Sequence, residues 1–86
     1  MTPVALTLIG KPDCHLCEDA RAVLDTVLPE FEPDSVSLDE VSILDDPELK
    51  ARYAEEIPVL LLNGAVHNIW RIDPDRLRRA LTEALA

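Results

Sequence analysis

The 86-residue sequence is poor in aromatic residues, of which it has only three: Phe31, Tyr53 and Trp70. Because single-stranded bases stack on platforms of aromatic side chains, this scarcity argues against that mode of nucleic-acid binding. The core is therefore expected to be aliphatic, and 48% hydrophobic residues is too high a share for a disordered chain. The length fits one domain, covering residues 1–86.

Basic residues are also scarce, because eight Lys and Arg stand against seventeen Asp and Glu, for a formal net charge of −9. Such an acidic surface repels phosphate backbones and anionic lipids, so we expect no nucleic-acid and no membrane partner. No apolar stretch reaches the roughly 20 residues that a transmembrane helix needs, and we expect no secretion signal because the first residues given lack a basic region. The sequence predicts a cytoplasmic protein, which we expect to be a monomer.

Cysteine is limited to Cys14 and Cys17, which are too few for a small domain held together by disulfides. In a reducing compartment, two neighbouring cysteines are more often catalytic, redox-sensing or metal-binding than structural. Structural zinc needs four ligands, and beyond this pair only His15 and His67 could serve, so we expect no metal site within one chain. Two inert, buried thiols remain the alternative to redox chemistry.

Apolar periodicity and turn residues predict the element order β-α-β-α-β-β-α. The expected strands cover residues 4–9, 36–43, 57–62 and 65–70, and the expected helices cover residues 16–28, 47–54 and 74–85. Asp46-Pro47 and Asp73-Pro74 are typical helix starts, and Asn63-Gly64 favours a tight hairpin turn. A β-α-β start requires a parallel strand pair, and the hairpin adds an antiparallel edge. We therefore predict an α/β fold with a four-stranded mixed sheet and helices on both faces.

The cysteine pair follows the first expected strand, in the segment Lys11-Pro12-Asp13-Cys14-His15-Leu16-Cys17. Two intervening residues let the sulfur atoms meet across one helical turn. Unpaired N–H groups and the helix dipole favour a thiolate at Cys14, the expected nucleophile, while Cys17 is expected to be the more shielded, resolving thiol. His15 can add positive charge, but three carboxylates oppose it, and the sequence leaves this balance open: Asp13, Glu18 and Asp19.

Three features resemble the glutaredoxin-like branch of the thioredoxin superfamily, and small bacterial members in particular, over nearly all of the chain. Lys11-x-x-Cys14-x-x-Cys17 is similar to the glutaredoxin active site. Ile57-Pro58 is similar to the family's Val-Pro, whose cis-proline lies against the cysteines and leaves a backbone edge free for a thiol substrate. Leu62-Asn63-Gly64 is similar to the family's hairpin turn. The resemblance implies a thioredoxin-like fold, and a thiol-disulfide oxidoreductase with catalytic Cys14 and Cys17 and with four residues that contact the substrate: Lys11, His15, Ile57 and Pro58.

The segment after the hairpin departs from glutaredoxins. Where they carry a Gly-Gly pair that helps to hold glutathione, this sequence has bulky side chains from His67 to Asp73. We expect these side chains to crowd the glutathione groove, although Arg71 or the N–H groups after Asp73 can receive a carboxylate. Trp70 is expected to pack against the sheet or the last helix.

The expected chemistry needs partners but no bound cofactor. The expected substrate is a disulfide-bearing protein or a small thiol compound, and the expected electron donor is glutathione, another low-molecular-weight thiol or a reductase. The alternative function is a non-enzymatic redox sensor or adaptor. The missing Gly-Gly pair favours it, as does the uneven distribution of charge, because fourteen of the seventeen acidic residues lie between Asp13 and Glu56.

Overall fold

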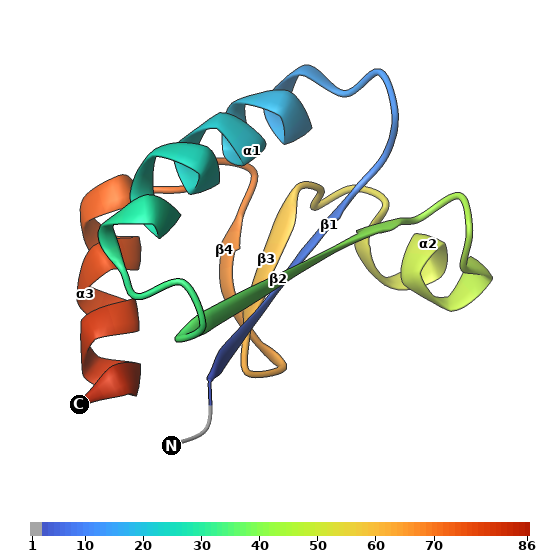
Figure 1. Cartoon of the computed structure of the whole chain (residues 1–86). Coiled ribbons are helices and arrows are strands. Elements are labelled where there is room, and N and C mark those ends of the chain that lie inside the picture. Colours follow the sequence, from blue (N-terminus) through green and yellow to red (C-terminus); the bar gives the residue numbers. More distant parts are fainter. Residues whose placement is uncertain (1–2) are drawn as a thin grey trace.

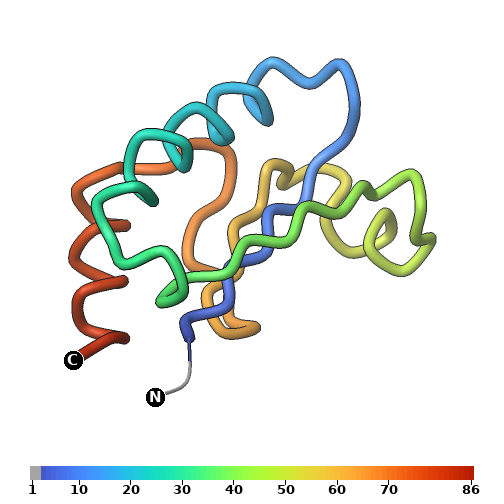
Figure 2. The backbone as a smooth tube through the Cα atoms, viewed as in Figure 1, coloured from blue at the N-terminus to red at the C-terminus, as the bar shows by residue number. Residues whose placement is uncertain are grey.

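A four-stranded mixed sheet lies at the centre of the computed structural model, which describes residues 3–86 (Figure 1 and Figure 2). Its strands are β1 (Val4–Gly10), β2 (Val36–Ser42), β3 (Val59–Leu62) and β4 (Ala65–Ile69), in the spatial order β2-β1-β3-β4. β1 pairs parallel with β2 and antiparallel with β3, and β3 pairs antiparallel with β4. The predicted mixed sheet is confirmed, and β1 and β3 are its two central strands.

Three helices cover the two faces of the sheet: α1 (His15–Val27), α2 (Pro47–Tyr53) and α3 (Pro74–Leu85). α1 and α3 lie side by side on one face, whereas α2 lies on the other face, near the end of β2 (Figure 1). A short 3-10 helix, η1 (Leu28–Glu30), continues α1 through Pro29, where the sequence predicts the helix to stop. Within residues 3–86, none of the helices is long and apolar enough to cross a membrane.

The core is aliphatic, as expected, and the two faces of β1 divide it. Leu8 packs with Leu24 of α1 and Leu77 of α3. The next residue, Ile9, points to the opposite face because successive strand side chains alternate. There it packs with Val59 in a second cluster that residues of α2 cover. β1 is therefore buried along one face and, at Ile9, on the other face as well, which accounts for its mostly apolar sequence.

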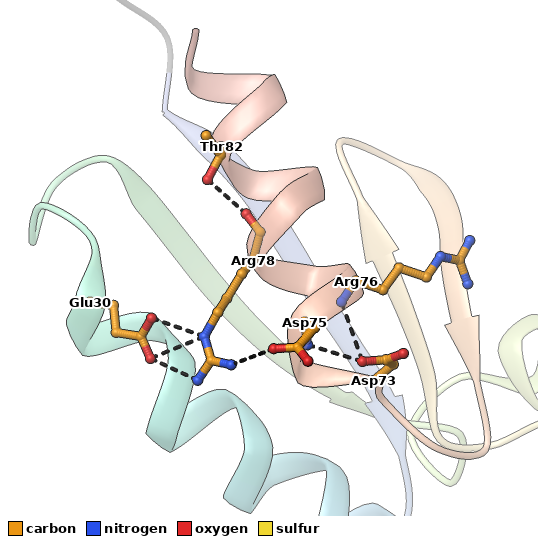
Figure 3. Close-up of polar contacts among 6 residues, drawn as sticks. All are labelled: Glu30, Asp73, Asp75, Arg76, Arg78 and Thr82. Carbon is orange, nitrogen blue, oxygen red and sulfur yellow. Dashed lines mark hydrogen bonds and ion pairs between the residues drawn. The ribbon is translucent and has the colours of Figure 1, made fainter.

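Side-chain caps begin all three helices. Oδ1 of Asp46 accepts a hydrogen bond of 2.9 Å from the N–H of Glu48. Oδ1 of Asp73 accepts hydrogen bonds from the N–H groups of Asp75 and Arg76 at 3.0 and 3.3 Å (Figure 3). These contacts confirm the helix starts predicted from the two Asp-Pro pairs. At α1 the capping residue is Cys14.

The Asn63-Gly64 turn joins β3 to β4, and both of its residues have positive φ, of 50° and 85°. This conformation is the one that a two-residue hairpin turn requires. The Asn63 side chain also fixes the turn to β1, because its Oδ1 accepts a hydrogen bond of 2.9 Å from the N–H of Ala5. The predicted hairpin is therefore confirmed.

An ion-pair network joins η1 to α3. The guanidinium of Arg78 lies between the carboxylates of Glu30 and Asp75 (Figure 3). Its Nε and Nη2 donate hydrogen bonds of 2.9 and 2.8 Å to the two carboxylate oxygens of Glu30, and its Nη1 donates one of 3.0 Å to Asp75. This bidentate contact links the end of the α1–η1 segment to α3.

Candidate functional site

Cys14 and Cys17 lie where β1 passes into α1, and their sulfur atoms are at disulfide distance. The two Cα atoms are 5.1 Å apart, a separation that suits a disulfide. Cys14 is the N-cap of α1, and its Sγ accepts a hydrogen bond of 3.2 Å from the N–H of Cys17. A backbone donor at the helix start, where N–H groups have no partner within the helix, is thus directed at the sulfur of Cys14.

Both cysteines are half-buried, and both pack against the apolar cluster that contains Ile9 and Ile57. The two cysteines thus fall in the same range of burial, and the greater shielding of Cys17 stays a prediction. A cavity of about 330 Å³ opens beside the pair, and it is lined by Cys17 and not by Cys14. Gly10, the last residue of β1, also lines this cavity.

The two cationic candidates of the motif lie differently. Lys11 is exposed and lines the cavity beside Cys17. The side chain of His15 is 95% exposed, and its Nδ1 lies 3.8 Å from the Oε2 of Glu18. The structure therefore places Lys11 at the cavity that Cys17 lines but directs His15 toward a carboxylate and the solvent.

Ile57 and Pro58 directly precede β3 and are buried, and the peptide bond between them is cis. The N–H of Ile57 donates a hydrogen bond of 3.1 Å to the carbonyl of Tyr53, and the carbonyl of Pro58 accepts one of 2.8 Å from the N–H of Trp70. The backbone edge expected to be free is thus partly used. Among residues 3–86, no hydrogen-bond donor reaches the carbonyl of Ile57.

Trp70 corrects a second expectation, because it is 52% exposed instead of being packed against the sheet or α3. Its indole Nε1 donates a hydrogen bond of 3.1 Å to the carbonyl of Glu55, and its φ is +64°. No local sequence pattern signals a tryptophan in this left-handed conformation, which bulky residues rarely adopt. The N–H groups after Asp73 are likewise already taken by the Asp73 carboxylate, so a ligand carboxylate would have to displace it.

His67, the second histidine of the sequence, is not brought to the cysteines. It lines a separate cavity of about 410 Å³ between β4 and α3. Burial lowers the pKa of His67, and the charge of Arg76 lowers it further. In the described part of the chain, His, Cys, Asp and Glu side chains form no group of three or more that could hold a metal ion.

Residues 5–82 match the model of a protein family described as "Glutaredoxin-like domain (DUF836)". The Mycobacterium tuberculosis protein Rv0508 and the Mycobacterium bovis protein Mb0520 are each 28% identical to this chain over 80 residues, which cover 91% of this chain and 82% of the relative.

Two solved structures are similar along almost their whole length. The X. campestris protein XcR50 is 32% identical, with a TM-score of 0.72 over 91% of this chain and 96% of that protein. The Nitrosomonas europaea protein Ne2328 is 23% identical, with a TM-score of 0.77 over 93% of each chain. Together with the element order, these likenesses confirm the thioredoxin-like fold that the sequence predicts.

Proposed function

The chain belongs to the glutaredoxin-like domain family, and on that basis we propose that it is a thiol-disulfide oxidoreductase. The observation that carries the proposal is the position of Cys14 and Cys17, at disulfide distance at the start of α1. The N–H of Cys17 directed at the Sγ of Cys14 supports a thiolate on Cys14, because a hydrogen bond to a charged group is stronger than one to a neutral group.

In the proposed cycle, the thiolate of Cys14 attacks one sulfur of a substrate disulfide. A mixed disulfide forms at Cys14, and the other substrate sulfur leaves as a thiolate. The thiolate of Cys17 then attacks the Sγ of Cys14, which releases the second substrate thiolate and closes the Cys14–Cys17 disulfide. Two electrons pass to the substrate, and an external thiol or a reductase must restore the pair. A reducing compartment such as the cytoplasm suits this cycle.

The surroundings of the pair favour protein disulfides and small thiol compounds over glutathione held in a glutaredoxin-type groove. Trp70 is anchored over the segment before Pro58, and Asp73 occupies the N–H groups of α3. We assign substrate contact to Ile57 through its free carbonyl and to Pro58 beside it, and contact with a small thiol to Lys11. His15, exposed between the two cysteines, is the remaining residue that we assign to substrate contact. No bound cofactor is required, and one chain contains all the groups named.

The direct test traps the mixed disulfide. Cys17→Ser should form a stable adduct with a disulfide-bearing protein substrate, visible by intact mass, whereas Cys14→Ser should form little of that adduct. The native protein should turn over the same disulfide when a thiol reductant is supplied. A pair that closes and opens but never passes electrons to a disulfide substrate would instead support a redox sensor or adaptor.

A further inference from the structure

The cavity beside the cysteine pair lies on the side of β1 that faces β2. Its lining includes Gly10, Lys11, Cys17, Ser42 and Asp45. β3 flanks β1 on the opposite side, so Pro58 and β4 lie away from this cavity. Of the two cysteines, it is Cys17 that lines this cavity.

Two charges of opposite sign line this cavity without a charged partner. Lys11 and Asp45 are both exposed, and neither takes part in an ion pair within residues 3–86. Glu40 also lines the cavity, but Arg21 already pairs with it. A free ammonium group and a free carboxylate beside a sulfur atom are complementary to a ligand that carries both charges itself.

We propose that the cavity binds a small zwitterionic thiol, with its carboxylate on Lys11 and its ammonium group on Asp45, and that this thiol reduces the disulfide by attacking Cys17. The step rests on the proposed function, for which it names the electron donor and the sulfur where electrons enter. Free cysteine and the γ-glutamyl end of glutathione share the required α-amino-acid group.

The chemistry balances with two molecules of thiol. The first thiolate bonds to the Sγ of Cys17, the Cys14–Cys17 bond breaks, and Cys14 leaves with the electron pair as a thiolate. A second thiolate attacks the sulfur of the bound molecule, which leaves as the small-molecule disulfide and frees the thiolate of Cys17. The two protons that the small thiols lose balance those that the protein thiols can take up.

Attack at Cys17 makes Cys14 the leaving group, and the structure favours that direction. The N–H of Cys17 already donates to the Sγ of Cys14, which is also the N-cap of α1. Both the hydrogen bond and the helix dipole stabilise negative charge as it develops on Cys14. A better-stabilised thiolate leaves faster in disulfide exchange.

The test measures how fast five thiols reduce the oxidised protein, by intact mass after acid quenching and alkylation. Cysteine and glutathione carry both charges, cysteamine lacks the carboxylate, 3-mercaptopropionate lacks the ammonium group, and 2-mercaptoethanol lacks both. Each rate is corrected for thiolate fraction and nucleophilicity, and about 0.5 M salt screens the overall negative charge. We expect at least one zwitterionic thiol to reduce the protein about tenfold faster than the corrected rates of the other thiols predict. One charge-assisted hydrogen bond to the bound thiol is strong enough to give a difference of this size.

Variants then assign the charges. Lys11→Ala and Asp45→Asn should each return the favoured thiol to the common trend, whereas Lys50→Ala and Asp34→Asn, exposed residues outside the cavity, should not. If cysteine alone reacts faster than the trend, the ligand of the cavity is the free amino acid. If glutathione alone does, the ligand is the γ-glutamyl end of glutathione.

The site of attack is tested separately in the single-cysteine variants with cystine. Cys14→Ser should form its adduct on Cys17 at a rate that Lys11→Ala lowers. The proposal is overturned if all five thiols follow one trend, if the two cavity variants react like their controls, or if removing Lys11 leaves adduct formation at Cys17 unchanged. Each of these results is compatible with Cys17→Ser still trapping a protein substrate on Cys14. The small-thiol proposal can therefore fail while the proposed oxidoreductase function holds.

Discussion

A Cβ atom on Gly10 would lie 2.9 Å from the Sγ of Cys17, closer than real Cβ atoms approach other atoms, and 3.3 Å from the Cβ of Cys17. The end of β1 therefore lets Cys17 sit against the backbone only because residue 10 has no side chain. Since a disulfide closes only within a narrow range of sulfur positions, this contact helps to set where Cys17 can meet Cys14.

Gly10→Ala should slow closure of the disulfide, because the added methyl group pushes the Cys17 side chain from its position. The rate of internal disulfide formation after reduction, followed by alkylation and intact mass, should fall several-fold. β1 should still form, because alanine is tolerated in extended backbone.

Gly64→Ala is the matched control for that substitution. Gly64 has a φ of +85° with open space around it, so alanine there strains the backbone without touching the cysteines. This variant should lose about 1 kcal/mol of unfolding free energy and close its disulfide at the native rate. If Gly10→Ala also closes at the native rate, the contact with Cys17 does not control the pair.

Trp70 should be a position where glycine is a better small replacement than alanine. Both substitutions remove the indole hydrogen bond to Glu55, but only glycine also relieves the left-handed backbone. In urea denaturation, Trp70→Gly should therefore be more stable than Trp70→Ala by about 1 kcal/mol. Equal stabilities would mean that the backbone relaxes once the indole is removed.

Much of the fold could be predicted because its signals are local. Asp46 and Asp73 cap helices through residues only two or three positions away, and Asn63-Gly64 forms its turn within four residues. The apolar run of β1 reflects the burial of one face along the strand and of Ile9 on the other face, and the amino-acid composition is enough to indicate it. The same local logic placed Cys14 and Cys17 at the start of a helix.

The rest of the site depends on contacts between segments that are distant in sequence. Trp70 donates a hydrogen bond to the carbonyl of Glu55, and Asp45 lines the same cavity as Lys11. No local sequence pattern predicts these contacts. Gly10 is recognisable as a strand end, but its contact with Cys17 depends on how α1 returns over the sheet. Hydrogen bonds around Ile57 depend equally on the path of the chain after α2.

Arg78→Lys should raise the pKa of Glu30 toward its ordinary value of 4.5. The hydrogen bonds from Arg78 hold that pKa down, and an ammonium group cannot reproduce the two-pronged contact (Figure 3). NMR titration of the Glu30 carboxyl carbon measures the change directly. Arg79→Lys, an exposed neighbour on α3, should leave the Glu30 titration unchanged.

The same pair contributes a pH dependence of defined sign. A carboxyl whose pKa is lower in the folded state adds stability above its unfolded value, and this stability is lost as pH falls through the folded value. Native protein should therefore lose more unfolding free energy on acidification than Arg78→Lys. Parallel pH profiles for the two proteins would contradict a stabilising role for the contact.

His67 should also make the protein less stable in mild acid. Its pKa in the folded state is lowered below the ordinary 6.5 by burial, and its Nε2 is buried with no hydrogen-bond partner among residues 3–86. The unfolded chain therefore takes up this proton at a higher pH than the folded one, and unfolding becomes easier as pH falls below 6.5. Urea denaturation between about pH 7 and about pH 5 should show a smaller loss of stability in His67→Gln than in the native protein. His15→Gln is the control, because it changes a side chain that is 95% exposed, and it should lose as much stability with falling pH as the native protein. If His67→Gln also loses as much stability as the native protein, the burial of His67 does not control the pH response.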